Sequence, residues 1–307
     1  MNNLTFQFFA GTAAKPFVKW VGGKGQLREV INEALPAEFR SQRELTYVEP
    51  FVGGGAVLFE MLKRYPNITK VVINDINDAL IRTYKTVRDH LEPLIAKLQT
   101  LQNSYDALAD HEQRKSFFLH QRETYNSFAN DDIAHSALFI FLNKTCFNGL
   151  HRVNSKGKFN VPFGGYPNPN ICDVQTLRGD SELLRRVEIL TGDFEQTLDY
   201  AGAAAFYYLD PPYKPISQTA SFNSYAKETF DDTAQIRLKD FCDALTRKES
   251  RWIMSNSDVR DNGAGDAFFD KLYSAYNIKR VFASRAVNSN GNKRGKISEL
   301  LITNIAS

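Results

Sequence analysis

The most informative pattern in the sequence is Asp210-Pro211-Pro212-Tyr213, which directly follows the apolar run Phe206–Leu209. Proline has no backbone N–H and a fixed φ, so this turn is expected to be stiff and to present carbonyl oxygens. A carboxylate beside a proline carbonyl provides two hydrogen-bond acceptors, which suit an exocyclic amine with two N–H donors. Tyr213 adds an aromatic face on which a planar base could stack. An isolated Asp-Pro-Pro usually only ends a strand, but the aromatic residue and the preceding strand favour chemistry here.

A glycine-rich turn upstream is a second candidate site. The run Phe51–Gly55 (F-V-G-G-G) follows a short β-branched segment, and Asp75 ends the next such segment about 20 residues later. Glycines let a ligand approach the backbone, and an acid at a strand end is well placed to accept hydrogen bonds from ribose hydroxyls. A nucleotide or NAD would fit this pattern equally well, although the G-x-G-x-x-G dinucleotide spacing is missing.

Lys24 lies in another glycine-containing segment, Trp20–Gly25. Comparison with a phosphate-binding P-loop fails, because Gly25 follows the lysine where Ser or Thr is required. The G-x-x-x-x-G-K spacing is absent as well. The sequence therefore disfavours a nucleoside triphosphatase.

The order of the expected elements indicates how these residues are positioned. Short strands at Thr46–Val48 and Lys70–Ile73 enclose a helix at Ala56–Tyr65, which is a βαβ unit of an open parallel sheet. Residues 79–141 have helical character with almost no strand signal, and a hairpin tip is expected at Ser155–Lys158. Further strands are expected at Val187–Leu190, Ala205–Leu209, Arg251–Met254, Ile278–Phe282 and Leu300–Thr303.

This order predicts an α/β fold with a discontinuous sheet domain. Residues 1–80 and 185–307 would form the strand-and-helix domain. Residues 81–184 would form an inserted helical subdomain that carries the hairpin, at about residues 143–166. Open α/β sheets bind ligands at the carboxyl ends of their strands, which is where the glycine turn, Asp75 and Asp210 are expected.

Charge is distributed unevenly along the 307 residues, although the formal net charge is only +3 at pH 7. Three stretches, 15–28, 143–166 and 285–296, each contain four basic residues and no acid, so the rest of the chain carries −9. Clusters of Lys and Arg bind phosphates locally, whatever the total charge. We therefore expect a cationic surface for a polyanion on an acidic body, although each stretch alone could be a solvated loop.

Other features exclude several classes of protein. Three scattered cysteines make no disulfide framework and suit a reducing cytoplasm. No apolar run approaches the roughly 20 residues of a membrane span, and the N-terminus shows no secretory signal. The five histidines lack metal-ligand spacing, so no metal site is expected. We expect His151 to lie at the surface or near a phosphate.

Together, these motifs resemble the Dam-type adenine-specific DNA methyltransferases, in which a glycine motif precedes an Asp-Pro-Pro-Tyr motif. The resemblance extends almost from end to end of the chain, in family order. The matching segments are Pro16–Lys24, Glu49–Gly55, Ile73–Asp75, Asn148–Asn154, Phe159–Gly164, Gly192–Phe194, Asp210–Tyr213 and Lys296–Leu301. It implies a Rossmann-like, S-adenosylmethionine-dependent methyltransferase sheet, with residues 81–184 as the target-recognition domain.

The resemblance also implies roles for individual residues. S-adenosylmethionine would lie across the strand ends, with Asp75 at its ribose and with Asp193 and Phe194 near its adenine. The other cofactor positions match Trp20, Lys24, Pro50, Phe51, Gly53 and Asp210.

The catalytic group implied by the resemblance is the Asp-Pro-Pro-Tyr motif itself. Asp210 and Pro211 would orient the target amine, and Tyr213 would stack on the adenine. The adenine must leave the duplex to reach such a pocket, which implies base flipping. The reaction would be an in-line methyl transfer that needs no metal.

The basic segment 143–166 is similar to the family's target-recognition element. Arg152 matches a guanine-contacting arginine, Lys19 matches the contact to the other guanine, and Phe147 matches an aromatic that inserts beside the flipped base. The other DNA-contacting positions are Asn148 beside this aromatic, Leu150 and Pro162 at a thymine methyl, and Lys144, Asn154 and Asn160 at phosphates. These similarities imply GATC in double-stranded DNA as the target.

The residues alone leave alternative functions open. Two acceptors would serve a cytosine amine or RNA equally well, although cytosine-amine enzymes resembling this group usually have Ser in place of Asp210. A non-catalytic DNA-binding regulator on the same scaffold is another alternative, against which Asp75 and the complete Asp-Pro-Pro-Tyr motif argue. A dehydrogenase lacks the dinucleotide glycine spacing. We expect a monomeric, cytoplasmic enzyme, with any cognate restriction endonuclease acting separately.

Overall fold

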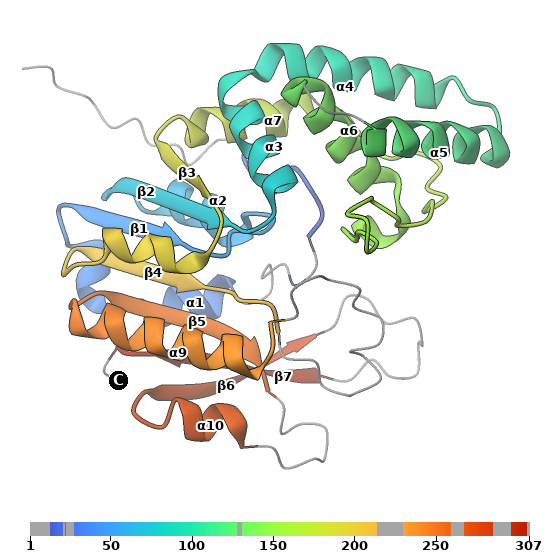
Figure 1. The fold of residues 1–307 in the computed structure, drawn as a ribbon. Helices are drawn as coiled ribbons and strands as arrows, with labels where there is room; N and C mark the ends of the chain where they lie inside the picture. The colour runs from blue at the N-terminus through green and yellow to red at the C-terminus, as the bar shows by residue number, and fades with distance from the viewer. Residues whose placement is uncertain are drawn as a thin grey trace, which may run out of the picture.

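The computed structural model describes residues 13–20, 22, 28–127, 131–213, 230–258, 267–284 and 296–305. At its centre is a seven-stranded sheet with the order β3-β2-β1-β4-β5-β7-β6 (Figure 1). Its strands are β1 Leu45–Glu49, β2 Ile68–Asp75, β3 Val187–Thr191, β4 Ala205–Leu209, β5 Arg251–Ser257, β6 Asn277–Ser284 and β7 Lys296–Thr303. Strands β1 to β5 are parallel, and β7 runs antiparallel to both of its neighbours, β5 and β6.

Helices cover both faces of the sheet, which explains why its central strands are apolar along most of their length. Tyr47 and Phe206 pack in one core with α1 (Arg28–Ala34) and α2 (Ala56–Arg64). Val48 and Tyr207, their chain neighbours, pack in a second core with η3 (Phe194–Tyr200), α9 (Asp232–Arg247) and α10 (Phe268–Leu272). Successive residues of a strand therefore face opposite layers. This is the Rossmann-like α/β fold that the sequence predicts.

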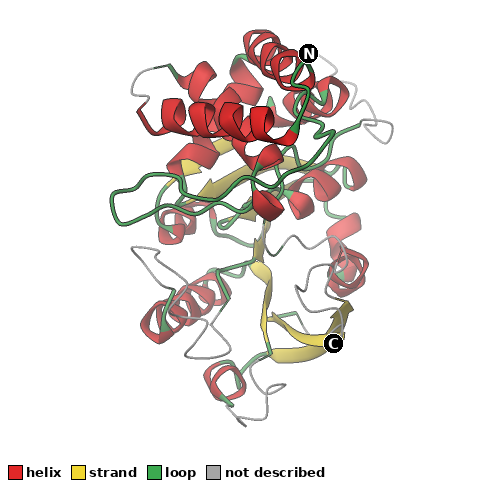
Figure 2. Cartoon of the chain, turned by 90° about the vertical axis from the view of Figure 1, so that its right-hand side faces the viewer, coloured by secondary structure: helices red, strands yellow, loops and turns green. Residues whose placement is uncertain are grey.

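A run of helices separates β2 from β3, as the sequence predicts. These helices are α3 Asp78–Asp89, α4 Leu91–Asp106, α5 His111–Ser127, α6 Asp132–Thr145 and α7 Val174–Leu184, with the 3₁₀ turn η2 at Phe147–Gly149. Buried side chains such as Leu98, Phe118 and Phe141 pack between them. Figure 2 shows these helices gathered at one end of the molecule, away from the antiparallel strands. Among the described helices, none has both the length and the apolar character to cross a membrane.

The expected hairpin within residues 143–166 is closed by single bridges rather than by short strands. Val153 pairs with Phe159, and Cys146 with Phe163, as isolated antiparallel bridges. Asn154 Oδ1 accepts the N–H groups of Lys156 and Lys158 at 2.9 and 3.0 Å. Side-chain acceptors of this kind compete with a strand ladder for backbone donors, which accounts for the difference from the expected strands.

Candidate active site

Acidic residues gather at the carboxyl ends of three adjacent parallel strands. Glu49 ends β1, Asp75 ends β2, and Asp210 directly follows β4. Because β1 lies between β2 and β4, these residues lie along one edge of the sheet. This is the edge at which open α/β sheets bind ligands.

The glycine turn after β1 packs against Trp20. Gly53 has a φ of 49°, and a Cβ built there would lie 2.8 Å from Trp20 Cδ1, so glycine is required for this close approach. The N–H of Gly53 donates to Asp75 Oδ2 at 3.0 Å. The structure thus brings together three predicted cofactor residues that are far apart in the sequence. Lys24, predicted from the same N-terminal segment as Trp20, lies outside the described residues.

The Asp75 carboxylate is fixed by backbone donors on both sides. Its Oδ1 accepts the N–H of Asn77 at 2.9 Å, and its Oδ2 accepts the N–H of Gly53. Burial raises the pKa of Asp75, and these donors oppose the rise because they stabilise the ionised form. The next residue, Ile76, is 64% exposed, so an apolar surface that sequence analysis missed lies beside this acid.

Glu49 is the acid of this edge to which sequence analysis gave no role. Its side chain is buried and accepts a hydrogen bond from the Tyr47 hydroxyl at 2.7 Å. Burial raises the pKa of Glu49 well above its usual range, and the carboxylates of Asp210 and Asp75 add to the rise. Its place in the motif Glu49–Gly55 was the only signal for it in the sequence.

The Asp-Pro-Pro-Tyr turn is fixed by residues of the neighbouring strand and helix. Ser255 of β5 donates to Asp210 Oδ1 at 3.1 Å, and the Tyr208 hydroxyl lies 3.0 Å from Ser255 Oγ. Gln235 of α9 donates to the Pro212 carbonyl at 3.3 Å. The carboxylate of this turn therefore has a defined orientation.

Tyr213 is fixed through its hydroxyl. It donates to Glu299 Oε2 of β7 at 2.8 Å. Burial, with the negative charges of Asp210 and Glu299, raises the pKa of Tyr213, so the phenol remains protonated. The segment Lys296–Leu301 belongs to the resemblance, but the sequence did not indicate that Glu299 orients this ring.

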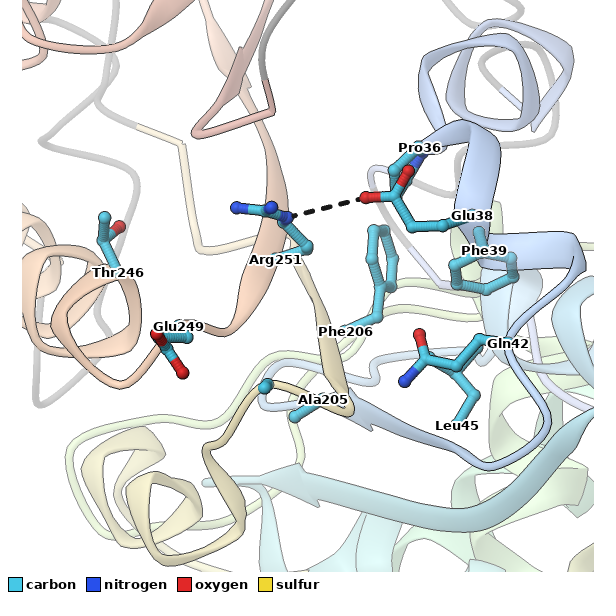
Figure 3. Close-up of a pocket in the computed structure, with 11 residues that line it drawn as sticks. Pro36, Glu38, Phe39, Gln42, Leu45, Ala205, Phe206, Thr246, Glu249 and Arg251 are labelled. Carbon is cyan, nitrogen blue, oxygen red and sulfur yellow. Dashed lines mark ion pairs between the residues drawn. The ribbon is translucent and has the colours of Figure 1, made fainter.

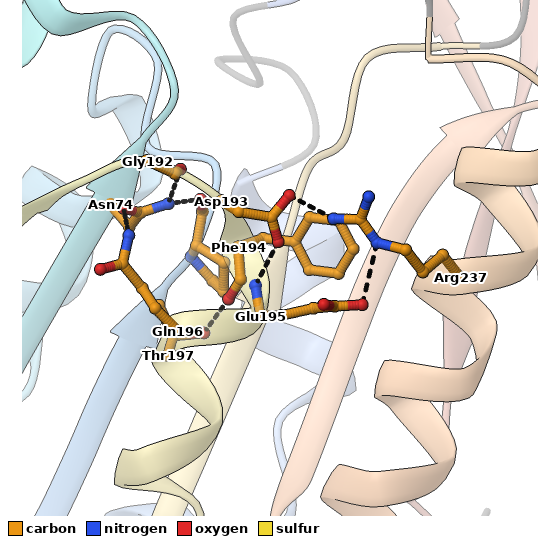
Figure 4. Close-up of polar contacts among 9 residues, drawn as sticks. Asn74, Gly192, Asp193, Phe194, Glu195, Gln196, Thr197 and Arg237 are labelled. Atoms are coloured by element: carbon orange, nitrogen blue, oxygen red, sulfur yellow. Dashed lines mark hydrogen bonds and ion pairs between the residues drawn. The ribbon is translucent and has the colours of Figure 1, made fainter.

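The end of β3 carries the predicted adenine-side pair, Asp193 and Phe194 (Figure 4). Arg237 of α9 forms ion pairs with Asp193 and, at 2.9 Å, with Glu195. The Arg237 guanidinium carbon lies 4.8 Å from the centre of the Phe194 ring. The Phe194 ring is also 5.2 Å from that of Phe51, so the glycine turn and this strand end meet. No local pattern in the sequence indicates this role of Arg237.

A buried asparagine joins Lys19 to the recognition segment. Asn143 accepts the N–H of Lys19 at 2.7 Å and donates to the carbonyls of Lys19 and Gly149 at 2.8 and 3.0 Å. Gly149 has a φ of 63°, and a Cβ there would lie 2.6 Å from Lys19 Cβ. The Lys19 ammonium lies 4.5 Å from the centre of the Tyr166 ring. Lys19 is therefore adjacent to the basic segment.

Arg152 and Asn160 face each other across the hairpin. Arg152 Nε donates to Asn160 Oδ1 at 2.8 Å, and Nη2 donates to the Asn160 carbonyl at 3.2 Å. Both contacts fix the guanidinium at an exposed position.

The remaining predicted DNA-contacting residues differ in exposure. Phe147 is 50% exposed and donates its N–H to the carbonyl of Pro162 at 2.9 Å, while Asn148 donates its N–H to the Tyr166 hydroxyl. Leu150 packs partly against the main core. Lys144 is partly buried, and burial, with the charge of Lys19, lowers its pKa.

His151, expected at the surface or near a phosphate, is partly buried among aromatic rings. Its ring packs against the rings of Trp20, Phe139 and Phe159, at 5.8, 5.5 and 5.9 Å between centroids. Burial lowers the pKa of His151 to about 4. The position of His151 beside Arg152 in the sequence did not indicate this packing, because the three aromatic rings come from three different segments of the chain.

A cavity of about 390 Å³ lies at the opposite end of the sheet (Figure 3). Leu45, Ala205 and Arg251, the first residues of β1, β4 and β5, line it. Arg251 and Glu38 form an ion pair at its edge, at 3.9 Å. None of the predicted site residues lines this cavity, so it is separate from the strand-end site.

The fold is an α/β sheet whose parallel strands carry a row of acidic residues at their carboxyl ends. Residues 20–287 match the family model of the D12 class N6 adenine-specific DNA methyltransferases. The chain belongs to this family, and it is an enzyme that methylates adenine in DNA. The resemblance to the Dam-type enzymes is confirmed. Because the family is specific for adenine in DNA, the alternatives of a cytosine amine, RNA or a non-catalytic regulator are not supported.

Individual relatives match almost the whole chain. Type II methyltransferase M.MjaIII of Methanocaldococcus jannaschii is 48% identical over 293 residues, which cover 94% of this chain and 99% of that protein. Type II methyltransferase M1.LlaDCHI of Lactococcus lactis subsp. cremoris is 36% identical, covering 94% and 95%. A DNA adenine methylase of Haemophilus influenzae is 31% identical, covering 94% and 92%.

Proposed function

We propose that this enzyme uses S-adenosylmethionine to methylate the 6-amino group of an adenine that is flipped out of duplex DNA, in the sequence GATC. The observation that carries the proposal is the fixed Asp-Pro-Pro-Tyr turn at the end of a row of strand-end acids. Similarity to DNA adenine methylases supports the substrate base. The recognition segment, with Arg152 exposed, supports a specific target sequence.

The strand ends fit S-adenosylmethionine better than a dinucleotide. Asp75 and Asp210 make this edge negative, and their charges add to the rise that burial causes in the pKa of the nearby Glu49. A negative edge favours a sulfonium cation and disfavours an anionic pyrophosphate. Asp75 would accept hydrogen bonds from the ribose hydroxyls. When bound, the cofactor supplies an electrophilic methyl group.

The other predicted cofactor residues lie around the same edge of the sheet, and each would contact a different part of S-adenosylmethionine. Phe194 and Asp193 would border the adenine, and the rings of Phe51 and Phe194 already meet there. Trp20 packs against the glycine turn, where Pro50 and Gly53 would approach the methionine moiety.

Asp210, Pro211 and Tyr213 would orient the target adenine. The Asp210 carboxylate and the Pro211 carbonyl would accept the two N–H groups of the amine, which directs the nitrogen lone pair toward the methyl donor. The ring of Tyr213, fixed by Glu299, would stack on the base. These residues accelerate the reaction mainly by positioning, because a correctly aligned pair of reactants needs little further assistance.

We propose residues 81–184 as the target-recognition domain. An enzyme that modifies a base must take it out of the stack, and the half-exposed ring of Phe147 is suited to replace it. Arg152 and Lys19 would contact the two guanines. The other proposed contacts are Asn148 beside Phe147, Leu150 and Pro162 at a thymine methyl, and Lys144, Asn154 and Asn160 at phosphates. Since one chain supplies all of these groups, we propose that the enzyme acts as a monomer. Any cognate restriction endonuclease would be a separate protein.

The proposed target predicts a specific protection pattern. Plasmid from cells that express the enzyme, and that otherwise lack adenine methylation, should resist a GATC endonuclease blocked by adenine methylation. Mapping of the modified adenines should place N6-methyladenine in GATC alone. Full sensitivity to the endonuclease, with modified adenines in another sequence, would refute GATC as the target sequence. It would leave adenine as the methylated base.

Arg237 should strengthen cofactor binding by orienting Asp193. We expect Arg237→Gln to weaken S-adenosylmethionine binding about two- to fivefold, the effect of losing a partly exposed ion pair. Arg247→Gln, at the end of the same helix, is the matched control and should bind normally. The measurement is titration calorimetry without DNA; unchanged or tighter binding by Arg237→Gln would contradict the assignment.

A further inference from the structure

His151 lies where the cofactor side of the site meets the recognition segment, and none of the proposed roles uses it. It directly precedes Arg152 in the sequence, yet its ring stacks on that of Trp20, with 20° between the planes. Phe159, from the other side of the hairpin, contacts the same imidazole. One histidine therefore contacts a predicted cofactor residue and the hairpin at once.

The imidazole is also hydrogen-bonded to the residue that fixes Asp75. Asn77 Nδ2 lies 3.2 Å from His151 Nδ1. The backbone N–H of Asn77 donates to Asp75 Oδ1 at 2.9 Å, and its Oδ1 caps α3 by accepting the N–H of Leu80 at 3.0 Å. Because burial lowers the pKa of His151 to about 4, the ring is neutral at pH 7 and Nδ1 accepts the amide proton.

These contacts form a closed ring of five residues around the proposed ribose site. His151 contacts Asn77, Asn77 contacts Asp75, and Asp75 contacts Gly53. Gly53 in turn packs against Trp20, and Trp20 stacks on His151. Four members come from the sheet side of the site, and only His151 comes from the recognition segment.

We infer that His151 is a positioning residue of the cofactor site, supplied by the DNA-recognition segment and acting through Asn77 and Trp20. This inference rests on the proposed binding of S-adenosylmethionine at Asp75. Its consequence is specific: a change in the recognition segment alters cofactor affinity when no DNA is present. A residue that served only DNA contacts would have no such effect.

Titration calorimetry with S-adenosylmethionine and no DNA tests the inference. His151→Phe keeps an aromatic ring against Trp20 but removes the acceptor for Asn77, so we expect about fivefold weaker binding, the size of one neutral hydrogen bond. The matched control is His135→Phe, because His135 also packs on an aromatic ring, that of Tyr125, at 4.5 Å between centroids. That variant should bind as wild type does. Equal affinity of His151→Phe and wild type would overturn the inference.

A double-mutant cycle separates positioning from a general loss of stability. Asn77→Ser retains a capping side chain for α3 but lacks the amide donor, and alone should also weaken binding about fivefold. If both residues act through one hydrogen bond, the double variant binds no more weakly than either single variant. Additive losses would overturn the inference. Failure of the wild-type enzyme to bind S-adenosylmethionine would instead refute the proposed function.

Discussion

Asp210→Ala should abolish methyl transfer to DNA while leaving the fold intact. The carboxylate is one of the two proposed acceptors for the target amine, and its loss removes the group that directs the nitrogen lone pair. A decrease on the order of 10³-fold in turnover is expected, as for other groups that act on the reacting atoms. The hydrogen bond from Ser255 that the folded state loses is worth about 1 kcal/mol.

The measurement is incorporation of a tritiated methyl group into DNA, together with the thermal unfolding midpoint. Asp199→Ala, which removes an exposed carboxylate from η3, is the matched control and should retain full turnover. Substantial residual turnover by the Asp210 variant, at a normal unfolding midpoint, would show that another group orients the amine.

Arg152→Ala should remove discrimination at one guanine of the target. A bidentate arginine–guanine contact is worth about 1–3 kcal/mol, so the preference for the correct base pair should fall roughly 5- to 150-fold. The structure supports this role because Asn160 orients the exposed guanidinium through two hydrogen bonds. The check is a comparison of methylation rates for GATC duplexes and duplexes with that base pair changed.

Lys156→Ala is the matched control at the tip of the same hairpin. Loss of an exposed lysine that contacts only phosphates weakens binding to all sequences alike and lowers the salt dependence of the affinity. The ratio of rates for correct and altered duplexes should therefore stay unchanged in this variant. If Arg152→Ala also leaves that ratio unchanged, a different residue recognises the guanine.

The sheet could be predicted from the sequence because its strands are covered on both faces. Ala205–Leu209 is apolar throughout, so the expected strand and β4 have the same ends. The hairpin was harder to predict, because Asn154 uses its side chain for backbone donors that a strand pair would need. A local pattern shows a turn, but not how its backbone donors are satisfied.

The site was predicted only where its residues belong to short motifs. Trp20, Gly53 and Asp75 were expected at the cofactor, and the structure places them in contact. Ser255 and Glu299, which fix Asp210 and Tyr213, were not, since their partners lie 45 and 86 residues away along the chain. Nothing local distinguishes such a serine or glutamate from others, because the contact exists only in the folded chain.

If the helices between β2 and β3 form the proposed recognition domain, their attachment to the sheet affects how the target sequence can change in evolution. The chain leaves the sheet after Asp75 and returns to pair Thr191 beside that same residue. Helices α3 and α7, the first and last of the intervening segment, lie together, with Ser181 donating to the Arg88 carbonyl. Exchange of the segment between them therefore leaves the strands, the glycine turn and the Asp-Pro-Pro-Tyr turn untouched. On the proposed role of residues 81–184, one recombination event would replace the guanine contact of Arg152, whereas that of Lys19, outside the segment, would remain. The incoming segment would also need an acceptor for Asn77.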